Sequence, residues 1–127
     1  MDLSEQAVHF RTVYGTPNSL ENREMQMDLI TEELSEFLEA HKGMMYNNSE
    51  LMSACTLKEL ADLVFVCFQY AENMEWDLLE ALNRVYRSNM SKLDENERPI
   101  YREDGKVLKG PNYKEPDLND LVVPQYA

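Results

Sequence analysis

Apolar residues recur along the first ninety positions at spacings that predict four helices. In residues 2–14, 20–42 and 77–92 they return every three or four positions, which places them on one face of a helix. The segment ending near Met74 differs, because residues 63–68 are apolar without interruption, as in a buried helix. That run alone could be a buried strand, but its helix-forming neighbours and total length favour a helix. We therefore expect an all-α fold with a helical core over about residues 2–92.

Polar and turn-forming residues predict where these helices begin and end. The turn residues at positions 15–19 separate the first two helices, and Gly43 is expected to end the second. The third helix has two candidate starting points. If Thr56 is the N-cap, Glu59 completes a capping box and is engaged at the helix end. If the helix begins at Ser49, Glu59 lies in mid-helix and its carboxylate is free to bind an ion.

From residue 93 onward the chain becomes polar and rich in glycine and proline. Asp104 and Gly105 lie between two short apolar runs, which favours a tight hairpin followed by an extended tail. The length of 127 residues and the lack of a linker indicate one domain over 1–127. So few helices leave apolar surface that needs a partner subunit. We therefore expect a bundle of about four helices that a homodimer or homotetramer completes.

The charge balance is strongly acidic, with 24 acidic and 12 basic residues and a net charge of −12. This balance argues against nucleic acid as a partner, because a phosphate backbone needs a basic footprint. Eight of the twelve basic residues lie from Arg84 onward, so a basic segment follows an acidic one. No stretch approaches the length of a membrane span, and the first residues lack the pattern of a signal peptide. Two cysteines do not make a disulfide framework, so we expect a cytoplasmic protein without membrane contact.

Two short acidic motifs carry the candidate chemistry. Glu33 and Glu36 in the second helix, and Glu59 and Asp62 in the third, are each three residues apart and therefore share a helix face. Two such pairs on facing helices would form a cage of four carboxylates, whose hard oxygen atoms suit Mg²⁺ or Mn²⁺. Neither motif has a Lys or Arg four residues later, so we expect no local ion pair to neutralise it. The ordinary alternative is a solvated acidic face.

Glu-Glu-x-x-Glu at 32–36, followed after residues 37–58 by Glu-x-x-Asp, resembles the all-α nucleoside triphosphate pyrophosphohydrolases. That superfamily includes MazG, the dimeric dUTPases and dCTPases, and phosphoribosyl-ATP pyrophosphohydrolase. Segments 87–93 and 100–111 also resemble a MazG-like branch found in bacteria and phages, and the match covers roughly residues 5–118. The resemblance implies a MazG-like helical bundle, located in the host cytoplasm if the chain is phage-encoded.

The resemblance implies that the four acids bind Mg²⁺, or Mn²⁺, against the phosphates of a nucleoside triphosphate. Water would attack the α–β linkage and release a nucleoside monophosphate and pyrophosphate. Glu32 is the candidate for orienting or deprotonating this water. It is about 100° from Glu33 around the helix, which also fits a surface acid.

The resemblance also indicates residues that would contact the substrate. Those expected at the phosphates are Arg87, Asn89, Lys92, Lys106 and Lys109, with Tyr113 a weaker candidate. Phe10, Tyr14 and Arg23 are candidates for the base, although Phe10 and Tyr14 also fit core or dimer contacts. The alternatives are a non-enzymatic helical dimerisation module and a degenerate member that binds a nucleotide without cleaving it.

Overall fold

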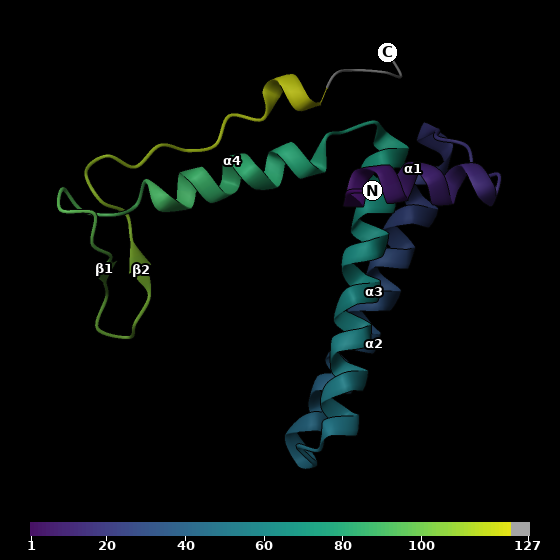
Figure 1. The fold of residues 1–127 in the computed structure, drawn as a ribbon, viewed down its shortest axis with the longest axis horizontal. Helices are drawn as coiled ribbons and strands as arrows, with labels where there is room; N and C mark the ends of the chain where they lie inside the picture. Colours follow the sequence, from purple (N-terminus) through teal and green to yellow (C-terminus); the bar gives the residue numbers. More distant parts are fainter. Residues whose placement is uncertain (123–127) are drawn as a thin grey trace. The chain divides into compact units, whose positions relative to one another are not determined.

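A computed structural model describes residues 1–122 and is mainly helical, which confirms the prediction of a helical fold (Figure 1). The elements are α1 (Leu3–Val13), a 3-10 turn η1 (Leu20–Asn22), α2 (Arg23–Tyr46), α3 (Glu50–Met74), α4 (Leu78–Met90), β1 (Ile100–Tyr101), β2 (Val107–Leu108) and a 3-10 turn η2 (Asn119–Leu121). Contacts divide the chain into two compact units, one ending at Trp76 and one beginning at Asp77. The last five residues of the predicted tail, 123–127, lie outside the described part.

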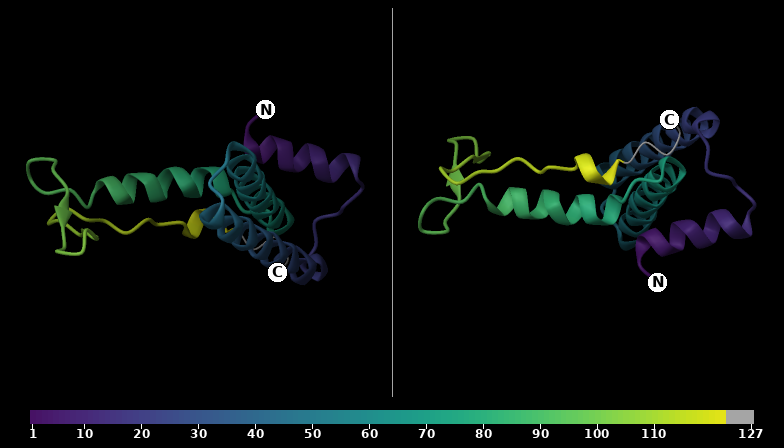
Figure 2. Two further views of the ribbon diagram at one scale, coloured as in Figure 1. Left: turned by 90° about the horizontal axis from the view of Figure 1, so that it is seen from below. Right: turned by 90° about the horizontal axis from the view of Figure 1, so that it is seen from above.

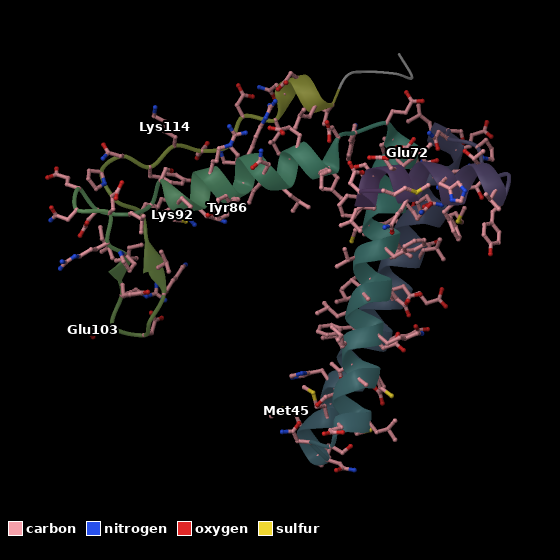
Figure 3. All side chains as sticks on the ribbon, in the orientation of Figure 1. Met45, Glu72, Tyr86, Lys92, Glu103 and Lys114 are labelled. Atoms are coloured by element: carbon pink, nitrogen blue, oxygen red, sulfur yellow. The ribbon has the colours of Figure 1, made fainter. Side chains whose placement is uncertain are left out.

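The first unit consists of an antiparallel hairpin of α2 and α3, with α1 packed against α3 (Figures 1 and 2). Residues 47–49 join the two long helices, and α1 crosses them at the opposite end. Figure 3 labels Met45 near the connecting loop and Glu72 near the end that α1 covers. The hairpin therefore sets the heights at which side chains of α2 and α3 meet.

The third helix begins at the earlier of its two candidate starts. Ser49 caps α3 by accepting a hydrogen bond from the backbone N–H of Met52 at 3.2 Å. Thr56 lies within the helix, where its hydroxyl donates to the carbonyl of Met52 at 2.8 Å and to that of Ala40 at 3.2 Å. Glu59 is therefore a mid-helix residue and is not part of a capping box.

The expectation that Gly43 ends the second helix is wrong, because α2 continues to Tyr46. A Cβ atom at Gly43 would lie 2.7 Å from the terminal methyl group of Met52 in α3. The glycine therefore serves close packing between the two helices, and its backbone stays helical. Tertiary contact overrides the local tendency of glycine to end a helix.

The interior of the first unit contains more polar than apolar side chains, five against three. Ala7, Phe68 and Ala71 are the buried apolar residues of the described chain, a small set for 122 residues. Of the apolar side chains that recur along the first helix, Ala7 is buried but Tyr14 is 71% exposed. Arg11 of the same helix is buried instead, with 4% exposure.

Arg11 connects α1 to the following loop and to α3. Its guanidinium donates to Oδ1 of Asn18 at 2.7 Å and to the carbonyl of Pro17 at 3.0 Å. It also donates to Oδ1 of Asn73 at 3.0 Å. Asn73 in turn donates to the carbonyl of Ser19 at 2.9 Å and accepts from its N–H at 3.1 Å. A buried charge is tolerated here because several acceptors surround it.

The second unit contains α4, the β-hairpin and a returning segment. Asp77 caps α4 by accepting from the N–H of Glu80 at 3.0 Å. The hairpin turns at Gly105, whose φ of +88° suits glycine, and pairs its two short strands antiparallel as predicted. The chain then returns along α4, where Ser88 donates to the carbonyl of Lys114 at 2.7 Å (Figure 1). Arg84 of α4 holds Asp120 at 3.0 Å.

Candidate metal centre

The antiparallel pairing of α2 and α3 brings three of the four predicted metal ligands together. Glu33 extends from α2, and Glu59 and Asp62 extend from α3 one turn apart. One carboxylate oxygen atom of each lies within 4.8 Å of the others. The three side chains are half-buried.

Two oxygen atoms of this cluster are buried and lack hydrogen-bond donors within the described chain, Oε2 of Glu33 and Oε2 of Glu59. A buried acceptor without a donor costs about 1–3 kcal/mol, and more when it is charged. The pKa of Glu33 is raised above its ordinary value of 4.5, first by burial and then by the neighbouring carboxylates of Glu36, Asp62 and Glu59. A cation bound among these oxygen atoms would give the buried acceptors a partner and would reduce the repulsion between the carboxylates.

The other two acids of the first motif stand outside this set of three. Glu36 is exposed, and its carboxylate adjoins that of Glu33, whose pKa it raises. Glu32 is exposed on α2 and does not belong to the cluster. Its proposed role in orienting water therefore stays a prediction.

A lysine adjoins the cluster, so the expectation of no local ion pair is wrong. Lys58 Nζ lies 2.7 Å from Asp62 Oδ2 and 3.6 Å from Glu59 Oε1. The lysine precedes Asp62 by four residues and therefore lies on the same face of α3. The hydrogen bond to Asp62 raises the pKa of Lys58, so the lysine stays charged. Its side chain is 67% exposed, so water screens the pair and the pair contributes little to stability.

The donor set fits a hard divalent cation. Oxygen atoms bound to one Mg²⁺ at about 2.1 Å are at most about 4.2 Å apart. That separation applies only to two opposed ligands, because ligands at right angles in octahedral geometry lie about 3.0 Å apart. The three oxygen atoms, which lie within 4.8 Å of one another, would therefore have to move closer together to bind one ion.

The residues predicted to contact phosphates all lie in the second unit. Arg87 forms an ion pair with Glu80 at 2.9 Å, and Lys109 Nζ lies 4.8 Å from the ring centroid of Tyr113. Lys92 lies just after the end of α4, near the hairpin (Figure 3), and Asn89, Lys106 and Lys109 are exposed. Their part in substrate binding stays a prediction.

The residues predicted to meet a base belong to the first unit. Phe10 and Tyr14 line a pocket there, whereas Arg23 is exposed and does not. Sequence reasoning missed two further lining residues, Gln26 and Gln69, which are buried. The available indication was an amide next to an apolar stripe, since Gln69 directly follows the apolar run of α3.

No protein-family model matches this chain, and no curated protein matches it either. Within residues 1–122, no helix has the length and apolar character needed to cross a lipid bilayer.

Proposed function

We propose that this protein is a Mg²⁺-dependent nucleoside triphosphate pyrophosphohydrolase of the MazG-like class. It converts a ribo- or deoxyribonucleoside triphosphate to the monophosphate and pyrophosphate, and so controls the nucleotide pool of the cytoplasm, or of the host cytoplasm if phage-encoded. The observation that carries this proposal is the cluster of Glu33, Glu59 and Asp62, two of whose oxygen atoms are buried without donors among residues 1–122. The resemblance of both acidic motifs to that superfamily adds the reaction class.

The cluster residues, with Glu36 beside Glu33, would hold Mg²⁺ or Mn²⁺. When bound, such ions supply positive charge that offsets the phosphates and activates water. The water oxygen bonds to the α-phosphorus while the bond to the bridging oxygen breaks, and pyrophosphate leaves. Glu32 takes the proton of the water.

Polar and basic residues of the second unit are the candidates for contact with the phosphates. The resemblance of segments 87–93 and 100–111 assigns this role to Arg87, Asn89, Lys92, Lys106 and Lys109. All five side chains are polar or basic, and all except Lys92 are exposed, so solvent and ligand reach them.

We also propose that the active protein is a homodimer or homotetramer. Support comes from large apolar side chains of α2 and α3 that are exposed in one chain, such as Leu38 at 49%, Leu57 at 66% and Leu60 at 41%. A second copy would bury this surface, whose free energy of transfer is about 25 cal/mol per Å². Sedimentation velocity of the wild type and Leu60→Lys tests this. A monomeric wild type would contradict it.

The enzymatic proposal is tested by incubating the protein with Mg²⁺ and a panel of nucleoside triphosphates. We expect monophosphate and pyrophosphate in equal amounts, and their loss in Glu33→Gln. Glu39→Gln, an exposed acid of the same helix, is the matched control and should retain activity. Release of orthophosphate alone would contradict the cleavage position, and activity retained in Glu33→Gln would contradict the site.

One observation favours a second reading, in which the protein is not an enzyme. The ion pair between Lys58 and Asp62 already offsets part of the negative charge, as expected in a helical dimerisation module or a degenerate nucleotide-binding module. Metal titration separates a plain helical module from the other two, because only a metal site is stabilised by Mg²⁺ or Mn²⁺. Turnover separates the enzyme from the degenerate module.

A further inference from the structure

A pocket of about 360 Å³ lies in the first unit, between α1 and the α2–α3 hairpin. Aromatic rings supply much of its wall, with Phe10 and Tyr14 from α1 and Phe65 from α3. Phe10 lies 4.4 Å from Tyr14 and 5.1 Å from Phe65, measured between ring centroids. Tyr14 is 71% exposed, so its ring is available to a planar ligand. The pocket is formed by one chain.

Two glutamines line the same pocket from facing helices, and each holds a buried polar atom without a hydrogen-bond partner in the described chain. Gln69 is 4% exposed, and its Oε1 accepts from Arg11 Nη1 at 3.5 Å. This contact orients the amide and leaves Nε2 as a donor without an acceptor. Gln26 is 3% exposed, and its Nε2 donates only weakly to the sulfur of Met25 at 3.6 Å, so Oε1 is an acceptor without a donor.

This arrangement costs stability in the empty protein. A buried donor or acceptor without a partner costs about 1–3 kcal/mol, and the pocket contains one of each. Apolar side chains would fill the space without that cost. Unsatisfied buried groups in a pocket therefore indicate an absent partner that offers both an acceptor and a donor.

The pocket is one helical turn away from the acidic cluster. Leu29 lines the pocket and precedes Glu33 by four residues in α2, while Val66 lines it and follows Asp62 by four residues in α3. Four residues of an α-helix rise about 6 Å. A ligand that reaches from the pocket to the cluster thus needs a ring at one end and an anionic group at the other.

We propose that Gln26 and Gln69 are specificity-determining residues that read the edge of a nucleobase held in this pocket. Gln69 Nε2 donates to a carbonyl or ring nitrogen of the base, and Gln26 Oε1 accepts from a neighbouring N–H. The ring packs against Phe10 and Tyr14. This inference rests on the proposed function only in taking the ligand to be a nucleotide, because the pocket itself uses neither the metal nor the acids.

The experiment uses deoxynucleosides, which carry no phosphate, in buffer with a metal chelator. Titration of the full chain with thymidine, deoxycytidine, deoxyadenosine and deoxyguanosine is followed by ¹H–¹⁵N spectra of the glutamine side-chain amides. We expect at least one nucleoside to shift the Gln26 and Gln69 amide signals in a saturable manner, while those of exposed Gln6 stay unchanged. This titration uses only the wild-type protein, so its result tests the proposal even if a substitution unfolds the protein.

Variants then assign the contacts. Gln69→Glu replaces the donor with an acceptor, and Gln26→Glu keeps an acceptor but adds charge. We expect Gln69→Glu to weaken nucleoside binding by about 10–100-fold, since a polar partner of the base is left unpaired. Gln6→Glu, the matched control on α1, should bind as the wild type does. A base that carries a methyl group on its ring nitrogen cannot donate to Gln26 Oε1, so it should bind weakly to the wild type. Gln26→Glu should weaken the binding of this methylated base little further.

The two proposals fail in different ways. Unshifted amide signals at the solubility limit of all four nucleosides would overturn the base pocket and leave ordered water as the partner of the glutamines. Metal-dependent hydrolysis could still be intact, and the acidic cluster would stand. If instead nucleosides bind at Gln26 and Gln69 but pyrophosphate is never released, the pocket stands and the hydrolase does not.

Discussion

Replacing Glu33 by glutamine should have opposite effects on stability with and without a divalent cation. Two unit charges 4.8 Å apart repel by about 3.5 kcal/mol at an effective dielectric constant of about 20, and by about 0.9 kcal/mol in water. Lys58 offsets part of the charge of Asp62, and the side chains of Glu59 and Asp62 are 21% and 36% exposed, so the lower part of this range applies. We expect metal-free Glu33→Gln to be about 1–2 kcal/mol more stable than the wild type.

With saturating Mg²⁺ or Mn²⁺ the order should reverse. A cation at 100 times its Kd stabilises the wild type by about 2.7 kcal/mol, whereas Glu33→Gln lacks a charged ligand and gains little. For a chain of this length each kcal/mol shifts Tm by about 3–4 °C. The assay is thermal unfolding of both proteins in a chelator and across a metal titration, with Glu39→Gln as the control. Curves that shift equally in all three proteins, or Glu33→Gln less stable without metal, would refute this reasoning.

The pH dependence of the same pair follows from the raised pKa of Glu33. Folding raises this pKa above 4.5, so between the two values the folded state binds more protons than the unfolded state. The stability of the metal-free wild type should therefore fall, relative to Glu33→Gln, as pH rises from about 4.5 through the folded pKa, and level off above it. Urea unfolding over a pH series measures this, and a difference that narrows with rising pH would contradict the assignment.

Four further substitutions test the packing and the charge balance. Asn73→Leu removes at least three hydrogen bonds and leaves buried Arg11 short of an acceptor, so urea unfolding should show a loss of about 2–4 kcal/mol. Gly110→Ala places a Cβ 2.6 Å from the carbonyl oxygen of Lys92 and should lower the free energy of unfolding by about 1–3 kcal/mol. Gly43→Ala meets only a flexible methionine side chain and should leave that free energy nearly unchanged. Amide hydrogen exchange, measured separately for the two units, distinguishes the two effects. Lys58→Met removes the ion pair with Asp62, so titration calorimetry should show tighter Mg²⁺ binding than in the wild type. Weaker Mg²⁺ binding in the variant would indicate that Lys58 belongs to the metal site.

Local periodicity was sufficient to predict the helices and the hairpin turn. Helix spacing and capping act within a few residues, so Asp77 and Gly105 are recognisable in the sequence, whereas the sequence leaves the start of α3 open between Ser49 and Thr56. The role of Gly43 does not follow from the local sequence, because the side chain that requires a glycine there is Met52 of another helix. The buried arginine of α1 was missed for the same reason, since its acceptors lie up to 62 residues away.

The candidate site was predictable to the extent that it follows from the pairing of two helices. Acids three residues apart on each helix must share a face, and a hairpin brings the faces together, so Glu33, Glu59 and Asp62 meet. The ion pair between Lys58 and Asp62 is predictable from the sequence, because the two residues are four positions apart on one helix. The burial of Gln26 and Gln69 is not predictable, because a polar residue beside an apolar stripe is ordinarily exposed to solvent.

The hairpin of α2 and α3 also fixes the distance between the pocket and the acidic cluster. Gly43 meets Met52, Glu33 shares a cluster with Asp62, and Gln26 shares a pocket with Gln69, and in every pair the two residue numbers add to the same total. One register therefore sets every facing position, and the distance between pocket and cluster is a property of helical rise rather than of side chains. From Gln26 to Glu33 this rise is about 10 Å. A change in this distance would require residues to be inserted or deleted in both helices at once, so the two long helices fix the length of any ligand that would join the pocket to the cluster.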